Sequence, residues 1–97
     1  MVVGVARVVV HIPMSQSLKE KRQVLKSLIA QVQQRFQVSI AEVDRQDQWQ
    51  IGVLGLACVT TSAGHADQII AHTVKFLQGR RADAEILDYE TEIVHAL

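Results

Sequence analysis

Residues 17–36, "SLKEKRQVLKSLIAQVQQRF", contain the clearest helical pattern of the sequence. Ser17 and Glu20 have the spacing of a capping box, in which each side chain accepts a hydrogen bond from an otherwise unpaired backbone amide. Apolar side chains then recur at the helical period on one stripe, at Leu18, Leu25, Leu28, Ile29, Val32 and Phe36. The stretch predicts an amphipathic helix that begins after Ser17, ends near Phe36 and buries one side.

The rest of the chain predicts four strands and a second helix. Runs rich in valine and isoleucine that end at proline or polar residues are typical of strands. The cap residues of "TTSAGHAD" predict a second helix that runs to about Gln78 and ends at Gly79. The strands are expected at residues 2–12, 38–43, 49–60 and 84–95.

This order of elements predicts an α+β fold of the ferredoxin-like split βαβ type. Two amphipathic helices are expected to cover one face of a four-stranded antiparallel sheet, with the first and third strands in the middle. A chain of 97 residues has room for one hydrophobic core, so residues 1–97 are expected to form a single domain. The second face of the sheet is left open, and its side chains therefore matter for function.

The composition favours a globular, cytoplasmic protein. Hydrophobic residues make up 48% of the chain, which is too many for a disordered segment. No apolar run reaches the roughly eighteen residues of a membrane helix. The apolar start "MVVGVARVVVHIP" lacks the basic leader and cleavage site of a signal peptide, and the single Cys58 allows no internal disulfide. No membrane association is expected.

The net charge is zero, but the charges are unevenly distributed. Residues 1–38 contain six lysines or arginines and one acidic residue. Residues 39–97 contain four lysines or arginines and nine acidic residues. Such a separation indicates charged faces and in some proteins an anion-binding surface. Because non-specific nucleic-acid binding depends on neutralising phosphates, DNA binding is not expected of a neutral chain.

Three cations of the first predicted helix form a basic ridge. With Leu18 at zero, Arg22, Lys26 and Lys19 fall at about 40°, 80° and 100° around the helix axis. The ridge is either the solvated side of an ordinary helix or a contact surface for RNA phosphates. Cations near a helix N-terminus oppose the macrodipole, which favours a functional use.

Lys21 does not belong to the basic ridge, because it falls inside the apolar stripe of the same helix. Its amine is expected to reach past the sheet edge, to a carboxylate or to a partner. The residues predicted to bind nucleic acid are Lys19, Lys21, Arg22 and Lys26, with Arg80 and Arg81 as further phosphate contacts.

The open sheet face is predicted from strand alternation. The side chains expected on this face of the two central strands include no phenylalanine, tyrosine or tryptophan, so base stacking on the sheet is not expected. They are Val5, Arg7, Val9 and His11 of the first strand and Val53, Gly55, Ala57 and Val59 of the third. In the last strand Asp88, Glu90 and Glu92, which would repel phosphate, alternate with Leu87, Tyr89 and Ile93. A small apolar surface of this kind is expected to be covered by a second copy or by the chain's own ends and loops, with Arg7 offsetting the acidic strand. The predicted homodimer interface contains Val5, Arg7, Val9, Val53, Gly55 and Ala57.

The stretch "EVDRQDQWQ" contains the carboxylates Glu42, Asp44 and Asp47, which could bind a metal or act in acid–base catalysis. Turn formation explains the two aspartates better, because their side chains accept hydrogen bonds from nearby amides. Trp49 is expected to hold the hairpin against the core or a partner subunit. The four histidines do not cluster. No catalytic residue, metal or cofactor is therefore predicted.

The motif "SLKEKRQVLKSL" followed by "VSIAEVDRQDQWQ" gives the chain a resemblance to a known family. The chain resembles the YlxP-like family of small bacterial proteins, a domain of unknown function, over essentially its whole length. The resemblance implies a ferredoxin-like fold and a gene often found among those of translation and ribosome maturation. It implies no established activity, so no catalytic residue is transferred.

These observations predict a non-enzymatic accessory factor that associates with RNA or ribosomes through the basic ridge. The alternative is a homo-oligomeric protein-interaction module that uses the open sheet face. RNA binding that weakens steeply with salt supports the first, whereas salt-insensitive association with a protein supports the second.

Overall fold

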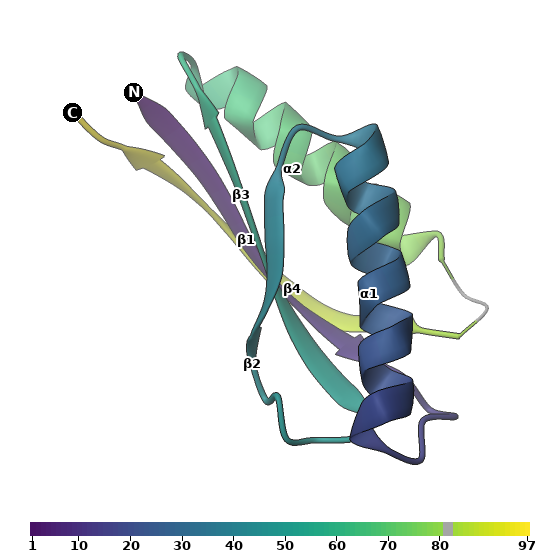
Figure 1. Ribbon diagram of the computed structural model, residues 1–97. Coiled ribbons are helices and arrows are strands. Elements are labelled where there is room, and N and C mark those ends of the chain that lie inside the picture. Colours follow the sequence, from purple (N-terminus) through teal and green to yellow (C-terminus); the bar gives the residue numbers. More distant parts are fainter. Residues whose placement is uncertain (81–82) are drawn as a thin grey trace.

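Figure 1 shows the protein in a computed structural model, which describes residues 1–80 and 83–97. The elements are β1 (Val2–His11), α1 (Leu18–Arg35), β2 (Ser39–Asp44), β3 (Ile51–Thr60), α2 (Ala63–Gln78) and β4 (Glu85–His95). Neighbouring strands pair antiparallel in the order β2-β3-β1-β4, and both helices pack on one face of the sheet. The predicted ferredoxin-like α+β fold is confirmed, with β1 and β3 in the centre.

The hydrophobic core lies between the helices and the sheet. On β1, Ala6, Val8 and Val10 are at most 5% exposed. Ala6 and Val8 pair with Leu56 and Leu54 of β3, which are equally buried. The alternation predicted for the first strand therefore describes which of its faces packs against the helices.

Helix α1 begins at Leu18 and ends at Arg35, as its sequence predicts. The Ser17 hydroxyl accepts a hydrogen bond from the Glu20 amide at 3.1 Å. The Glu20 carboxylate accepts from the amide of Gln16 at 2.6 Å, one residue earlier than in a capping box. Both side chains thus fix the start of the helix, although the amide that Glu20 binds belongs to a residue before the helix.

Two β-bulges change which side chains face the open side. On β2, Glu42 pairs with Leu54 and Asp44 with Val53, so Val43 has no partner across the sheet. On β4, the pairing skips Leu87 between Ile86 and Asp88. Leu87 is consequently 54% exposed. A bulge inserts one residue into the alternation, which a simple parity argument does not include.

Val53 was predicted to lie in an exposed interface, but its side chain is fully buried at 0% exposure. It faces the open side between Val9 and Asp44 of the neighbouring strands. The Arg7–Asp44 ion pair, at 3.2 Å, joins β1 to β2 and therefore crosses β3 near this position. Val53 presents no surface to a partner, which corrects its predicted role.

No helix in the described part of the chain is both long and apolar enough to cross a membrane.

Candidate functional site

Lys21 is the most unusual side chain of the protein, because its long cationic side chain is completely buried. Its ammonium group donates hydrogen bonds to the carbonyls of Arg45, Gln46 and Ile51 at 2.9, 3.3 and 3.2 Å. It also lies 2.9 Å from the Oε2 atom of Glu42. The prediction that Lys21 reaches a carboxylate is confirmed.

The Lys21 contacts join the first turn of α1 to the connection between β2 and β3. Its three N–H groups match the three carbonyls, whereas the buried Oε2 atom of Glu42 is close enough for an ion pair but accepts no hydrogen bond. A charge taken out of water is tolerated only with such partners. Lys21 is therefore used within the protein and leaves the predicted nucleic-acid-binding set.

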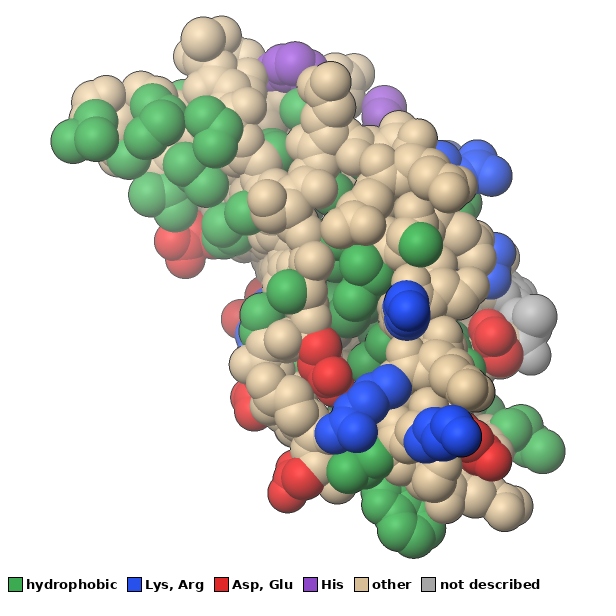
Figure 2. Space-filling model, viewed as in Figure 1, with side chains coloured by type: hydrophobic (Ala, Val, Ile, Leu, Met, Phe, Trp, Pro, Cys, Tyr) green, Lys and Arg blue, Asp and Glu red, His purple; other side chains and the backbone are tan. Residues whose placement is uncertain are grey.

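The basic ridge, Lys19, Arg22 and Lys26, lies on the exposed side of α1. None of the three forms an ion pair within residues 1–80 and 83–97. Figure 2 shows lysine and arginine side chains over the lower half of α1, with acidic side chains beside them. The ridge is thus open to a ligand, in a surrounding of mixed charge.

Two other arginines of the helix layer, Arg80 and Arg35, already contact other side chains of the protein. The Arg80 guanidinium donates a hydrogen bond to the side-chain carbonyl of Gln31. The Arg35 guanidinium lies 4.8 Å from the ring centre of Phe76. Arg81, expected to add a phosphate contact, lies outside the described residues.

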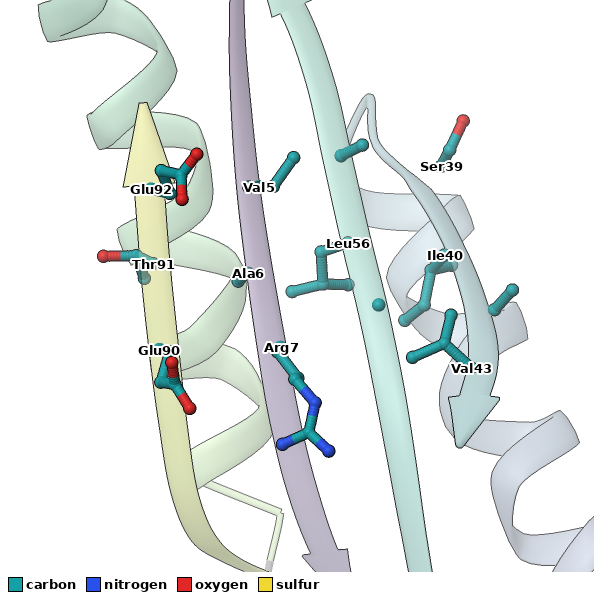
Figure 3. A pocket seen from close by; sticks show the side chains of 13 residues that line it. Val5, Ala6, Arg7, Ser39, Ile40, Val43, Leu56, Glu90, Thr91 and Glu92 are labelled. Carbon is teal, nitrogen blue, oxygen red and sulfur yellow. The ribbon is translucent and has the colours of Figure 1, made fainter. Parts of the chain in front are cut away.

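The open sheet face contains a shallow groove with a volume of about 560 Å³. Figure 3 shows side chains from all four strands around it. Its floor contains Val5, Gly55 and Ala57 of the two central strands, and Val43 of β2 forms one side. Glu90 and Glu92 of β4 form the opposite side. Four of the predicted interface residues, Val5, Arg7, Gly55 and Ala57, line this groove.

Gly55 permits the close approach of Val43 to the sheet. A Cβ atom at position 55 would lie 2.8 Å from the Cγ1 atom of Val43, which is too short for a normal contact. Val43 can fold over β3 because Gly55 has no side chain. The bulge on β2 and this glycine together shape the groove.

Arg7 does not offset the acidic last strand as expected. Although it pairs across the sheet with Glu90, its guanidinium binds Asp44 on the opposite edge, at 3.2 Å. The Asp44 carboxylate also accepts a hydrogen bond from the Arg45 amide at 2.7 Å. The hydrogen bond from the Arg45 amide, together with the one from the Arg7 guanidinium, lowers the pKa of the Asp44 carboxyl group below its ordinary value.

The chain matches the family described as "Protein of unknown function (DUF503)" over residues 3–91, from β1 into β4. The chain belongs to this family. It is also 41% identical over 61 residues to "Uncharacterized protein YlxP" of Bacillus subtilis (strain 168), a match that covers 63% of this chain and 66% of that protein. The predicted resemblance to YlxP-like proteins is confirmed.

In this DUF503 protein the carboxylates of "EVDRQDQWQ" do not converge on one site. Glu42 faces the helix side and binds Lys21, whereas Asp44 binds Arg7 on the open side. Within residues 1–80 and 83–97, no group of three or more acidic, histidine or cysteine side chains is placed to hold a metal ion. Trp49 is 56% exposed and does not pack into the core.

Two features of the DUF503 structure were missed from the sequence. Val43 shares its strand parity with Ser39 and Ala41, which line the same groove, so alternation along β2 was a signal for its position. Glu42 had a usable signal, because it shares its strand parity with the buried Ile40 and faces the same side as Lys21.

Proposed function

We propose that this DUF503 protein is a non-enzymatic factor that associates with RNA or ribosomes in the cytoplasm through its basic ridge. The observation that carries the proposal is the exposure of Lys19, Arg22 and Lys26 on one side of α1, where the described residues provide no ion pair for them. Cations near a helix N-terminus are locally unfavourable. Their free energy falls when they contact phosphates.

Trp49 supports the proposal, because it offers an exposed aromatic ring, which the groove on the open sheet face lacks. It lies in the β2–β3 connection that Lys21 ties to the first turn of α1, and it is 56% exposed. Figure 2 shows hydrophobic side chains at the lower end of the molecule, next to the basic ones. Exposed cations and an exposed aromatic ring are the two components that surfaces for single-stranded nucleic acid combine.

The test is the binding of a fluorescent oligouridylate RNA by the native protein and by the triple variant Lys19→Ala, Arg22→Ala, Lys26→Ala. If the ridge contacts phosphates, the variant loses affinity, and the slope of log K against log salt becomes shallower by roughly 0.7 for each lost contact. An unchanged affinity and an unchanged slope would exclude the ridge as the RNA contact.

A matched pair of single variants separates the ridge from the total charge. Lys26→Gln removes a cation from the ridge, whereas Lys75→Gln removes an exposed cation from α2. Lys26→Gln is expected to weaken RNA binding, and Lys75→Gln is expected to leave it nearly unchanged. Equal losses would mean that the attraction is general and not located on α1.

A second candidate function is protein interaction through the open sheet face. The observation that favours it is the groove of about 560 Å³ with its apolar floor, on the sheet face opposite to the two helices of the described chain (Figure 1). In its simplest form the partner is a second copy, giving the expected homodimer. Light scattering at tens of micromolar protein tests this form, and a monomeric mass would reject it.

A further inference from the structure

The groove on the open sheet face combines an apolar floor with a one-sided charge. Val5 and Ala57 lie next to each other on the central strands, and Val43, which is 52% exposed, stands beside them. The side chains of Glu90 and Glu92 face the same groove from β4, while Thr91 between them points away (Figure 3). The floor can take apolar side chains, and its β4 margin attracts cations.

No cation of the described chain neutralises this margin. Glu90 and Glu92 form no ion pair within residues 1–80 and 83–97. Arg7, which pairs across the sheet with Glu90, binds Asp44 instead, and His11 binds Glu85 at 2.8 Å. The groove therefore carries acidic groups that a ligand with positive charge would pair.

A second copy that packs its open sheet face on this groove does not supply that charge. If two sheets pack face to face with β4 over β4, the Glu90 and Glu92 side chains meet their own copies. If β4 instead lies over β2, the acids meet Ser39, Ala41 and Val43. Like charges placed together, or carboxylates buried without a partner, oppose association. Phosphate groups of a nucleic acid are repelled for the same reason.

We infer that the groove binds a segment of a partner protein in which apolar residues accompany lysine or arginine. The apolar side chains of the partner segment pack on Val5, Ala57 and Val43. Its lysine or arginine side chains pair with Glu90 and Glu92. This rests on the second candidate function, that the open face binds protein, and it names the chemistry of the partner. The volume of about 560 Å³ is within the range of ligand-binding clefts.

The experiment measures binding of a fluorescent short peptide in which lysine and leucine alternate, by anisotropy. Glu90→Lys is expected to weaken it by about threefold to fivefold, because an exposed ion pair is replaced by a repulsion. Val43→Asp is expected to weaken it further, since it places a charge beside the apolar floor. Asp67→Lys makes the same charge reversal at an exposed site on α2 and is expected to have little effect.

Two further peptides decide between the possible results. The inference requires that a peptide with glutamate in place of lysine binds more weakly, as does one with serine in place of leucine. Equal binding of the glutamate peptide would overturn the inferred charge but leave a protein-binding face. No peptide binding, together with a monomeric mass, would remove the second candidate function itself. A dimer that Val43→Asp dissociates would overturn the inference in favour of self-association.

Discussion

Strand β2 is held from opposite sides by two ion pairs that differ in burial. On the helix side Lys21 and Glu42 are 2.9 Å apart, with side chains 0% and 18% exposed. On the open side Arg7 and Asp44 are 3.2 Å apart, with side chains 44% and 58% exposed. Water can replace a lost partner in the second pair but not in the first. Neighbouring contacts with the same chemistry should therefore differ several-fold in their effect on stability.

The largest effect is expected from Lys21→Met. The substitution keeps most of the side-chain volume but leaves three carbonyls without their donor and the Glu42 carboxylate without its opposite charge. It should lower the free energy of unfolding by on the order of 3 kcal/mol. Urea denaturation measures this, with Lys26→Met on the exposed side of the same helix as the control. Equal, small losses in both variants would show that the buried ammonium does not hold the hairpin.

A smaller effect is expected from Glu42→Gln. Lys21 keeps its three carbonyl acceptors and loses only the opposite charge of the carboxylate. The loss should be about 1–2 kcal/mol. In a double-mutant cycle with Lys21→Met, the two losses should not add, because both changes break the same contact. Additive losses in urea unfolding would argue that Glu42 acts independently of Lys21.

Gly55→Ala tests the open side and should cost about 1 kcal/mol or less. The new methyl group would lie 2.8 Å from Val43 Cγ1, but Val43 is exposed and can move. In the background Val43→Ala the same substitution should become neutral or slightly stabilising, since alanine also reduces the freedom of the unfolded chain. Thermal unfolding of the four proteins measures the coupling. A loss that persists in the Val43→Ala background would place the clash elsewhere.

The smallest effect is expected from Asp44→Asn, and it should depend on pH. The folded-state pKa of Asp44 lies below its ordinary value, so the carboxylate contributes stability above that value and loses it as pH falls through the folded-state pKa. The stability difference between the native protein and the variant should therefore shrink from neutral pH towards about pH 3. Urea midpoints measured across this range provide the test, and a difference that grows on acidification would contradict it.

The fold was predictable from the sequence because its signals are local. The cap at Ser17, the apolar stripe of α1 and the alternation of β1 each depend on residues within a few positions of one another, and all three agree with the structure. The alternation predicted for Leu87 with Tyr89 and Ile93 is broken by the bulge on β4, since a bulge arises from the pairing with another strand. Arg7 was expected to offset the acids of β4 but binds Asp44 of β2. That partner lies 37 residues away along the chain and is brought close only by strand pairing.

The sequence by itself determined that Lys21 lies inside the apolar stripe of a helix and that Lys19, Arg22 and Lys26 do not. Only the tertiary structure decided what Lys21 binds, because its carbonyl acceptors lie 24 to 30 residues further along the chain. It also decided that the open face is a groove with an acidic margin, which depends on strand register, one bulge and the space above Gly55. Periodicity fixes the direction of a side chain, whereas its partner depends on how distant segments meet.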